Sequence, residues 1–261
     1  MRGIILKESE ILDKALKGEI DKKTMFTLRV LTKFYFIEDN SKEQVEIKLN
    51  EYMKKYYSGY KPSKWKDILN QLVKSVSKLD TYELQDVDSI SITENEWNSI
   101  LKLEKKQLQK LAFILLVYCK INNEKNKEIR NKINQNFTDI FYEAHLRMCD
   151  ETKLLLTELK KIGYIDTSLV CDSTTITVKY CDYNSKTKFV IDNFVNVISY
   201  YDEYISNKKY ISCEVCKKRI IKTKHNVKYC SKCFKYIKNE KNKEYFSKVR
   251  KAQYNSNLSK T

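Results

Sequence analysis

Apolar residues recur at helical spacing through the first 80 residues of the chain. Asp21 precedes one such segment as an N-cap residue. Ser41 with Gln44 three residues later has the spacing of a capping box, which marks the start of another helix. The pattern predicts a bundle of four helices over residues 1–80. A connector with a short strand is expected over 81–92.

The pattern changes after Thr93, which forms a second capping-box motif with Glu96. Helical and alternating segments then follow one another, and three helices precede a hairpin with a polar turn. That order predicts a winged-helix-like α+β domain over residues 93–206, with a generic α+β packing as the alternative. The expected elements are helices over 106–121, 137–144, 151–162 and 192–206, and a hairpin of strands 174–180 and 188–191.

The helix expected over 151–162 would be the recognition helix of such a domain. Its apolar residues should face the core, and they are Leu155, Leu156, Leu159 and Ile162. Its outward positions include Thr and Lys but no Arg, Asn or Gln, the side chains that read base edges best. Residues 93–207 also have no net charge. DNA contact and protein contact therefore both stay open for this helix.

Charge and composition add a second level of organisation. The 261 residues include 50 Lys and Arg against 34 Asp and Glu, a net charge of +16, with only 4 Gly and 1 Pro. Few helix breakers predict a mainly α protein with a small β component. Residues 208–261 alone carry +14. So strong a local excess points to a polyanionic partner, with nucleic acid the first candidate and a membrane surface the second.

The same basic segment contains the strongest motif in the chain. Cys213 and Cys216 form one Cys-x2-Cys knuckle, and Cys230 and Cys233 form another after thirteen residues. Two knuckles at this separation are typical of a four-thiolate site for one structural Zn²⁺. The metal would fold a segment that has almost no core of its own. Two alternatives to a metal site are free cysteines that have this spacing by chance and cysteines with a redox role.

Residues 207–261 thus read as a zinc ribbon or treble clef that ends in a basic helix over 231–252. Phe234, Ile237, Phe246 and Val249 are expected to pack that helix. Basic side chains of this module would bind the phosphate backbone of a nucleic acid, and DNA is expected in preference to RNA. These are Lys217, Lys218, Arg219, Lys222, Lys224, Lys228, Lys232, Lys235, Lys238, Lys241, Arg250 and Lys251. A metal-folded knob that binds protein, with lysines that only solvate it, is the alternative.

Catalytic motifs are not found. The sequence has no Gly-rich phosphate loop, no His-Glu-x-x-His motif, no Gly-x-Ser-x-Gly motif and no nuclease-like carboxylate cluster. Its longest apolar run, residues 111–119, is far shorter than a membrane span needs. Without a recognisable signal peptide, a cytoplasmic protein that is not an enzyme and does not bind membranes is expected. The Lys, Asn, Ile and Tyr bias suggests a bacterial host of low GC content.

The whole chain resembles a group of phage and prophage proteins. The resemblance is carried by TLRVLTKFYF (27–36), LAFILLVY (111–118), LKKIGYI (159–165) and CEVC with KYCSKC. It implies a helical N-terminal domain, a winged-helix-like middle domain and a C-terminal four-Cys zinc ribbon. Through SKEQVEIKLNEYMKKYY (41–57) and PSKWKDILNQLVKSV (62–76), the front of the chain is also weakly similar to the small helical domain at the C-terminus of some phage and plasmid primases. It lacks the primase catalytic carboxylates.

Two functions follow as hypotheses. The first is a non-enzymatic nucleic-acid-binding protein of a phage or mobile element, in replication or transcription control, which holds the backbone through the basic zinc module. The second is a phage-encoded interaction protein that modulates a host polymerase, helicase or defence complex, with zinc purely structural. The neutral middle domain favours the second hypothesis, and the basic segment favours the first.

Overall fold

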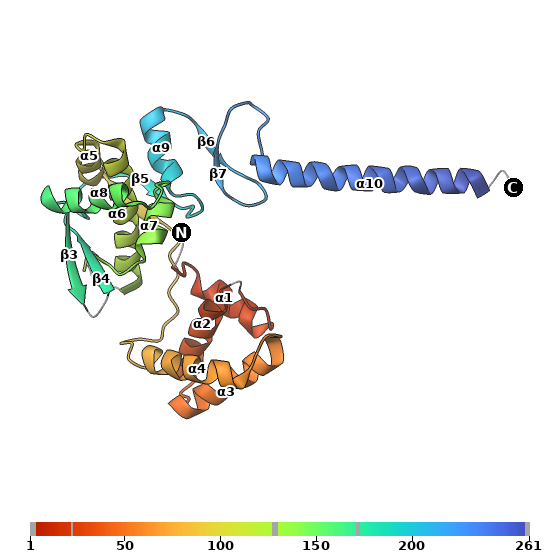
Figure 1. Cartoon of the computed structure of the whole chain (residues 1–261), viewed down its shortest axis with the longest axis horizontal. Helices are drawn as coiled ribbons and strands as arrows, with labels where there is room; N and C mark the ends of the chain where they lie inside the picture. Colours follow the sequence, from red (N-terminus) through yellow and green to blue (C-terminus); the bar gives the residue numbers. More distant parts are fainter. Residues whose placement is uncertain (1–3, 22, 127–129, 171–172, 259–261) are drawn as a thin grey trace. The chain divides into compact units, whose positions relative to one another are not determined.

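The computed structural model describes residues 4–21, 23–126, 130–170 and 173–258, apart from the side chains of 169–174 and 250–258. It is mainly helical with a small sheet component (Figure 1), as the sequence predicts. The chain forms two compact units. The N-terminal unit consists of residues 3–90 with 120–131, and the C-terminal unit is built from 91–119 and 132–261.

This division differs from the four predicted segments in three respects. The connector expected over 81–92 is grouped almost entirely with the N-terminal helices. The segment 207–261, which carries the four cysteines, belongs to the same unit as the middle of the chain. Residues 120–131 also join the N-terminal unit, although the hydrophobic pattern gives no sign of it.

The first four helices belong to the N-terminal unit: α1 (Glu8–Leu16), α2 (Thr24–Ile37), α3 (Lys42–Tyr56) and α4 (Pro62–Val76). The capping box at α3 is confirmed, because the Gln44 amide donates to Ser41 Oγ at 3.3 Å and the Ser41 amide donates to Gln44 Oε1 at 2.7 Å. The prediction of Asp21 as an N-cap is wrong. Its carboxylate instead accepts from the Lys23 amide at 2.8 Å, a local turn that delays the helix start to Thr24.

A buried charge cluster joins distant parts of this unit. The carboxylate of Glu8, which is 2% exposed, accepts from Lys33 Nζ at 2.8 Å and from Lys125 Nζ at 3.2 Å. The Gln85 amide donates to the same carboxylate at 3.1 Å. Burial lowers the pKa of Lys125, and the charge of Glu8 opposes that shift. One carboxylate therefore holds two ammonium groups from α2 and from the end of the long helix α6.

Removing this carboxylate should strongly destabilise the N-terminal unit. Glu8→Gln leaves two buried ammonium groups without their counter-charge, and breaking a buried ion pair in this way costs about 3–5 kcal/mol. Urea denaturation followed by circular dichroism measures the loss. Glu10→Gln is the matched control, because Glu10 lies exposed on the same helix and should shift the free energy of unfolding by less than about 0.5 kcal/mol. Equal stability of the two variants would contradict a structural role for Glu8.

The C-terminal unit surrounds the first part of α6. Its elements up to residue 206 are β1 (Ile90–Thr93), α5 (Glu94–Leu101), α6 (Lys106–Asn126), β2 (Lys132–Ile133), α7 (Phe137–Glu143), α8 (Asp150–Lys161), β3 (Ile165–Val170), β4 (Ser173–Val178), β5 (Thr187–Ile191) and α9 (Ile198–Ser206). The capping box of Thr93 with Glu96 is confirmed. Residues 111–119 of α6 are fully buried, so this apolar run forms the core of the unit. Among the described residues, no helix combines the length and apolarity needed to cross a bilayer.

The strand pairing differs from the predicted hairpin. Strand β4 lies between β2 and β3 in an antiparallel sheet, with Ile176 opposite Ile133 and Val178 opposite Ile165. Strand β5 pairs with β1 instead of β4. Gly163, at φ +79°, lets the chain reverse after α8 and brings β3 back beside the helix. The hairpin of 174–180 with 188–191 is therefore wrong, because the partner of each strand lies elsewhere.

The exposed side of α8 is more apolar than the sequence predicts. Leu155 and Leu159 are buried as expected, but Ile162 is 49% exposed and Leu154 is 65% exposed. Ile162 is the first residue after the helix, where the chain already turns toward β3, so its side chain leaves the buried face.

Candidate metal centre

The four cysteines of the two knuckles come together at the end of a short hairpin. Strands β6 (Tyr210–Ser212) and β7 (Arg219–Ile221) pair antiparallel, and the first knuckle forms the turn between them. The second knuckle starts the last helix, α10 (Ser231–Leu258). Cys230 precedes the helix directly, so the positive end of the helix dipole lies at the cluster.

The geometry confirms that the knuckles form one cluster. The sulfur atoms of Cys213, Cys216, Cys230 and Cys233 all lie within 4.8 Å of one another. The Sγ atoms of Cys216 and Cys230, one from each knuckle, are 3.8 Å apart. Four sulfurs at such distances can ligate a single metal ion.

Backbone hydrogen bonds fix the orientation of the sulfurs. The amide of Cys230 donates to Cys213 Sγ at 3.3 Å, and the amide of Cys233 donates to Cys230 Sγ at 3.4 Å. In the first knuckle the amide of Lys217 donates to the Cys213 carbonyl at 2.9 Å. Lys217 takes a left-handed conformation, φ 59°, which the tight turn requires and which favours Gly. The knuckle is thus held by the backbone.

These contacts separate the pKa values of the thiols. Burial raises the pKa of Cys213, but amide N–H groups from Cys216, Cys230 and Val215 outweigh it and bring the pKa to about 6. The amide of Cys233 lowers the pKa of Cys230. A side-chain hydrogen bond with Cys230, together with burial, raises the pKa of Cys233 to about 12. Neighbouring sulfurs compete for the same protons and the same N–H donors.

The cluster takes the place of an apolar core in this part of the chain. Among the described side chains from 207 to 249, Cys213 is the only buried one. The aromatic residues of this segment are exposed or only half-buried. The hairpin and the helix start are therefore held by the sulfurs and by contacts to α9. We call residues 207–261 the four-Cys module.

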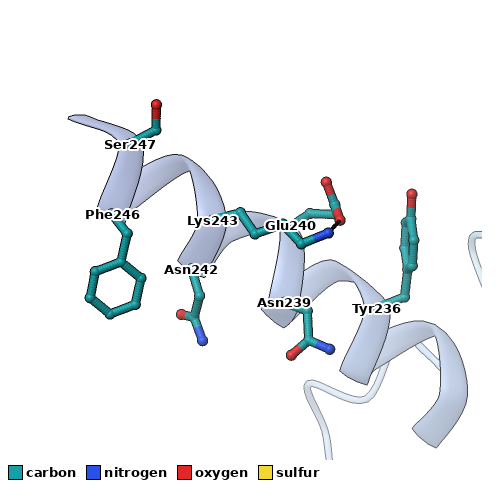
Figure 2. A pocket seen from close by; sticks show the side chains of 7 residues that line it. All are labelled: Tyr236, Asn239, Glu240, Asn242, Lys243, Phe246 and Ser247. Atoms are coloured by element: carbon teal, nitrogen blue, oxygen red, sulfur yellow. Dashed lines mark hydrogen bonds and ion pairs between the residues drawn. The ribbon is translucent and has the colours of Figure 1, made fainter. Parts of the chain in front are cut away.

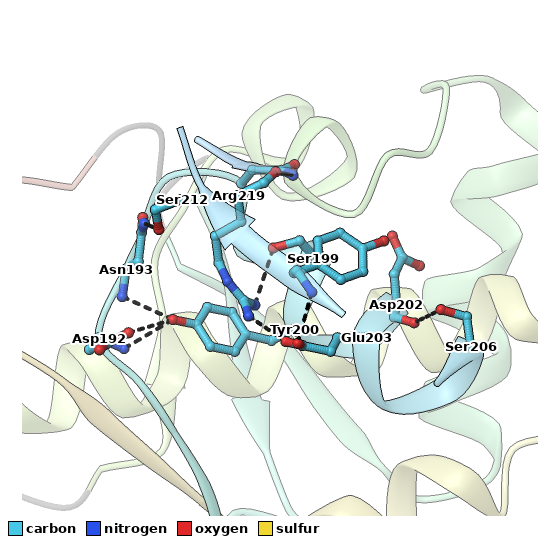
Figure 3. Close-up of polar contacts among 11 residues, drawn as sticks. Asp192, Asn193, Ser199, Tyr200, Asp202, Glu203, Ser206, Ser212 and Arg219 are labelled. Carbon is cyan, nitrogen blue, oxygen red and sulfur yellow. Dashed lines mark hydrogen bonds and ion pairs between the residues drawn. The ribbon is translucent and has the colours of Figure 1, made fainter. Parts of the chain in front are cut away.

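Arg219 attaches the four-Cys module to α9 (Figure 3). Its guanidinium lies 3.5 Å above the ring centre of Tyr200, forms an ion pair with Glu203 and donates to Ser199 Oγ at 3.4 Å. The side chain of Arg219 is only 11% exposed. Asn193 adds a second connection, because its Nδ2 donates to the Lys217 carbonyl at 2.7 Å. Arg219 is thus engaged within the fold and is not available to bind a phosphate, contrary to the sequence prediction.

Sequence reasoning missed Tyr200 and Glu203 as partners of this arginine. The available signal is that Arg219 is one of only two Arg residues in a segment otherwise rich in Lys. The planar guanidinium can stack on a ring and form an ion pair at the same time, which an ammonium group does less well.

The remaining candidate phosphate contacts lie mainly on the surface. Lys222 is half-buried, and the exposed residues are Lys217, Lys218, Lys224, Lys228, Lys232, Lys235, Lys238 and Lys241. Lys228 lies 3.5 Å from Glu214 in an exposed ion pair. The side chains of Arg250 and Lys251 lie outside the described residues.

The expected packing of the last helix is wrong. Phe234 is 56% exposed and Phe246 is 59% exposed, while Ile237 and the described Val249 are half-buried. The helix also continues to Leu258 instead of ending at Ala252. Its apolar residues therefore do not form a buried face against the described part of the chain.

Comparison with known proteins adds no relative: no protein-family model, no curated protein and no solved structure matches this chain.

Loss of one ligand should unfold the four-Cys module selectively. In Cys216→Ser the fourth thiolate is missing, so bound metal falls below one ion per chain and trypsin cleaves within residues 207–249 more readily. Elemental analysis and limited proteolysis measure the two effects. Cys149→Ser is the control, because Cys149 lies at the N-cap of α8, where Ser is favoured. Unchanged metal content in Cys216→Ser would contradict a four-sulfur site.

Loss of the guanidinium should loosen the four-Cys module from α9. Arg219→Ala removes the stacking on Tyr200 and leaves Glu203 without its partner, so the amides of β6 should exchange hydrogen at least tenfold faster. Hydrogen exchange with mass spectrometry provides the readout. Lys218→Ala, at the exposed neighbouring position, should leave the exchange rates unchanged. Similar rates in both variants would show that Arg219 holds nothing in place.

Proposed function

We propose that this chain is a non-enzymatic nucleic-acid-binding protein that contacts the phosphate backbone through the four-Cys module. Its ligand would be DNA in preference to RNA. The observation that carries this proposal is the charge around the cluster: residues 208–261 hold 17 basic and 3 acidic residues. Three carboxylates can neutralise only a few of these cations within the module. As a protein of a phage or mobile element, it would act in replication or transcription control.

Zinc is the ion that the donor set favours. Zn²⁺ binds four thiolates in a tetrahedron with Zn–S distances of about 2.3 Å, which places the sulfurs about 3.8 Å apart. The distance between the Cys216 and Cys230 sulfurs is 3.8 Å, in agreement with this geometry. Four protein ligands leave no open position, so the ion would be structural. With four thiolates and one Zn²⁺ contributing −2, the four-Cys module would keep a net charge of about +12.

The middle of the chain supports a winged-helix assignment. The order of elements is α6, β2, α7, α8, β3 and β4, and the sheet order β2-β4-β3 places the short first strand beside the last one. Helix α8 would then be the recognition helix. Its Lys153 is paired with Asp150 at 2.8 Å, and Lys160 donates to Thr167 Oγ1 at 2.9 Å. Because residues 93–207 carry no net charge, the basic four-Cys module is favoured as the main phosphate contact.

A second candidate function is favoured by the apolar surface of α8. Leu154 and Ile162 are exposed there, and this part of the chain carries no net charge. An exposed apolar surface without a charge excess suits a protein partner better than a phosphate backbone. The middle of the chain would then bind a host or phage protein, while the four-Cys module supplies a structural zinc site.

Nucleic-acid affinity should depend on the lysines of α10 and on salt. A variant with Lys232, Lys235, Lys238 and Lys241 changed to Gln should bind a labelled 20-base-pair duplex at least tenfold more weakly than the native chain at 50 mM salt. The slope of log K against log salt should also become shallower, by about 0.9 for each lysine that contacts a phosphate. Fluorescence anisotropy between 50 and 200 mM salt measures both quantities.

A matched variant separates position from total charge. Lys54, Lys64, Lys66 and Lys74 are exposed on α3 and α4, and changing them to Gln removes the same charge from the other compact unit. That variant should keep most of the nucleic-acid affinity and most of the slope of log K against log salt. Equal losses in both variants would show that only net charge matters, and absence of binding by the native zinc-loaded chain at 50 mM salt would refute the proposed function.

A further inference from the structure

One side of α10 carries a regular series of side chains. Lys232, Tyr236, Asn239, Lys243 and Phe246 follow one another at alternating spacings of four and three residues. Residues at these spacings lie on the same face of an α-helix. Figure 2 shows the last four of them one after another along the helix, around a shallow surface depression. We call these five residues the α10 stripe.

All five side chains of the α10 stripe are open to solvent. Tyr236 is 64% exposed and Phe246 is 59% exposed, and Lys232, Asn239 and Lys243 are also exposed. Lys243 forms an ion pair with Glu240 at 2.9 Å, which an exposed position makes weak. The α10 stripe therefore presents two aromatic rings among ammonium and amide groups, on a helix whose described apolar side chains are exposed or half-buried.

Charge decides which partner fits the α10 stripe. Residues 231–249 contain six lysines against Glu240 and Glu244, so a second copy of the same helix would be repelled. Lysine and asparagine at three of the five positions also make the stripe a poor coiled-coil seam, which needs apolar side chains. A polyanion is the complementary partner, in agreement with the proposed function.

The aromatic rings further specify the state of that polyanion. Bases in a duplex are stacked on each other and offer only their edges, whereas unpaired bases can stack on exposed rings. Tyr236 and Phe246 are ten residues apart, about 15 Å along the helix, which is the length of four to five stacked nucleotides. We propose that the α10 stripe binds single-stranded nucleic acid, with Tyr236 and Phe246 stacking on bases and Lys232 and Lys243 contacting phosphates. This inference rests on the proposed function and names its ligand.

The test removes the rings without removing charge. Tyr236→Leu and Phe246→Leu keep an apolar side chain and good helix propensity. With the full zinc-loaded chain and a labelled dT20 strand, each should weaken binding about fivefold or more, and the double variant should lose more than either alone. Affinity for a duplex of mixed sequence should change less than twofold. Phe234→Leu is the matched control, because Phe234 is equally exposed on α10 but lies off the stripe.

The outcomes separate this inference from the proposed function. A selective loss of dT20 affinity in Tyr236→Leu and Phe246→Leu, with Phe234→Leu unchanged, would support the α10 stripe as the single-strand site. Native-like dT20 affinity in the double variant, with the lysine dependence intact, would overturn the stripe and leave the proposed function standing. Absence of binding to both dT20 and duplex by the native chain would overturn both. Circular dichroism of each variant establishes that the helix content is unchanged.

Discussion

The C-terminal part of this protein depends on the contact of four sulfur atoms, which holds its hairpin and the start of its last helix together. Cys213 is the only buried side chain among those described from 207 to 249, so this segment has almost no apolar burial to offset the entropy of ordering its backbone. The two knuckles bring the hairpin and the start of α10 to one point. Because Cys230 directly precedes α10, the same cluster that closes the hairpin also fixes where the helix begins. The stacking of Arg219 on Tyr200 then connects this point to the apolar core of the unit.

The protein uses charge in two opposite ways. In the N-terminal unit Lys33 and Lys125 lie against Glu8 in a buried cluster, where each ammonium group has a counter-charge within hydrogen-bond distance. Along α10 the lysines far outnumber the carboxylates, and those from 232 to 248 are exposed. Buried charges must be matched within the fold because water cannot solvate them. The exposed excess has no such requirement and is available to an external polyanion.

Local signals in the sequence predict local structure well. The two Cys-x2-Cys knuckles and the capping boxes at Ser41 and Thr93 each depend on residues a few positions apart, and each is confirmed. Contacts between residues far apart in the chain have no comparable local motif in the sequence. Strand β5 pairs with β1 across most of the C-terminal unit, and Arg219 finds Glu203 through the fold. The predicted packing of α10 is wrong for a related reason. Apolar residues become buried only where another part of the chain supplies a surface to cover them.

The length of α10 gives the cluster a mechanical consequence. The helix runs for 28 residues without Gly or Pro, which corresponds to about 42 Å. It starts beside the metal ligands, so a rotation of about 10° at the second knuckle would displace its far end by about 7 Å. The helix therefore acts as a lever arm. A small change in the geometry of the four sulfur atoms would therefore move the last turns of α10 by several ångström.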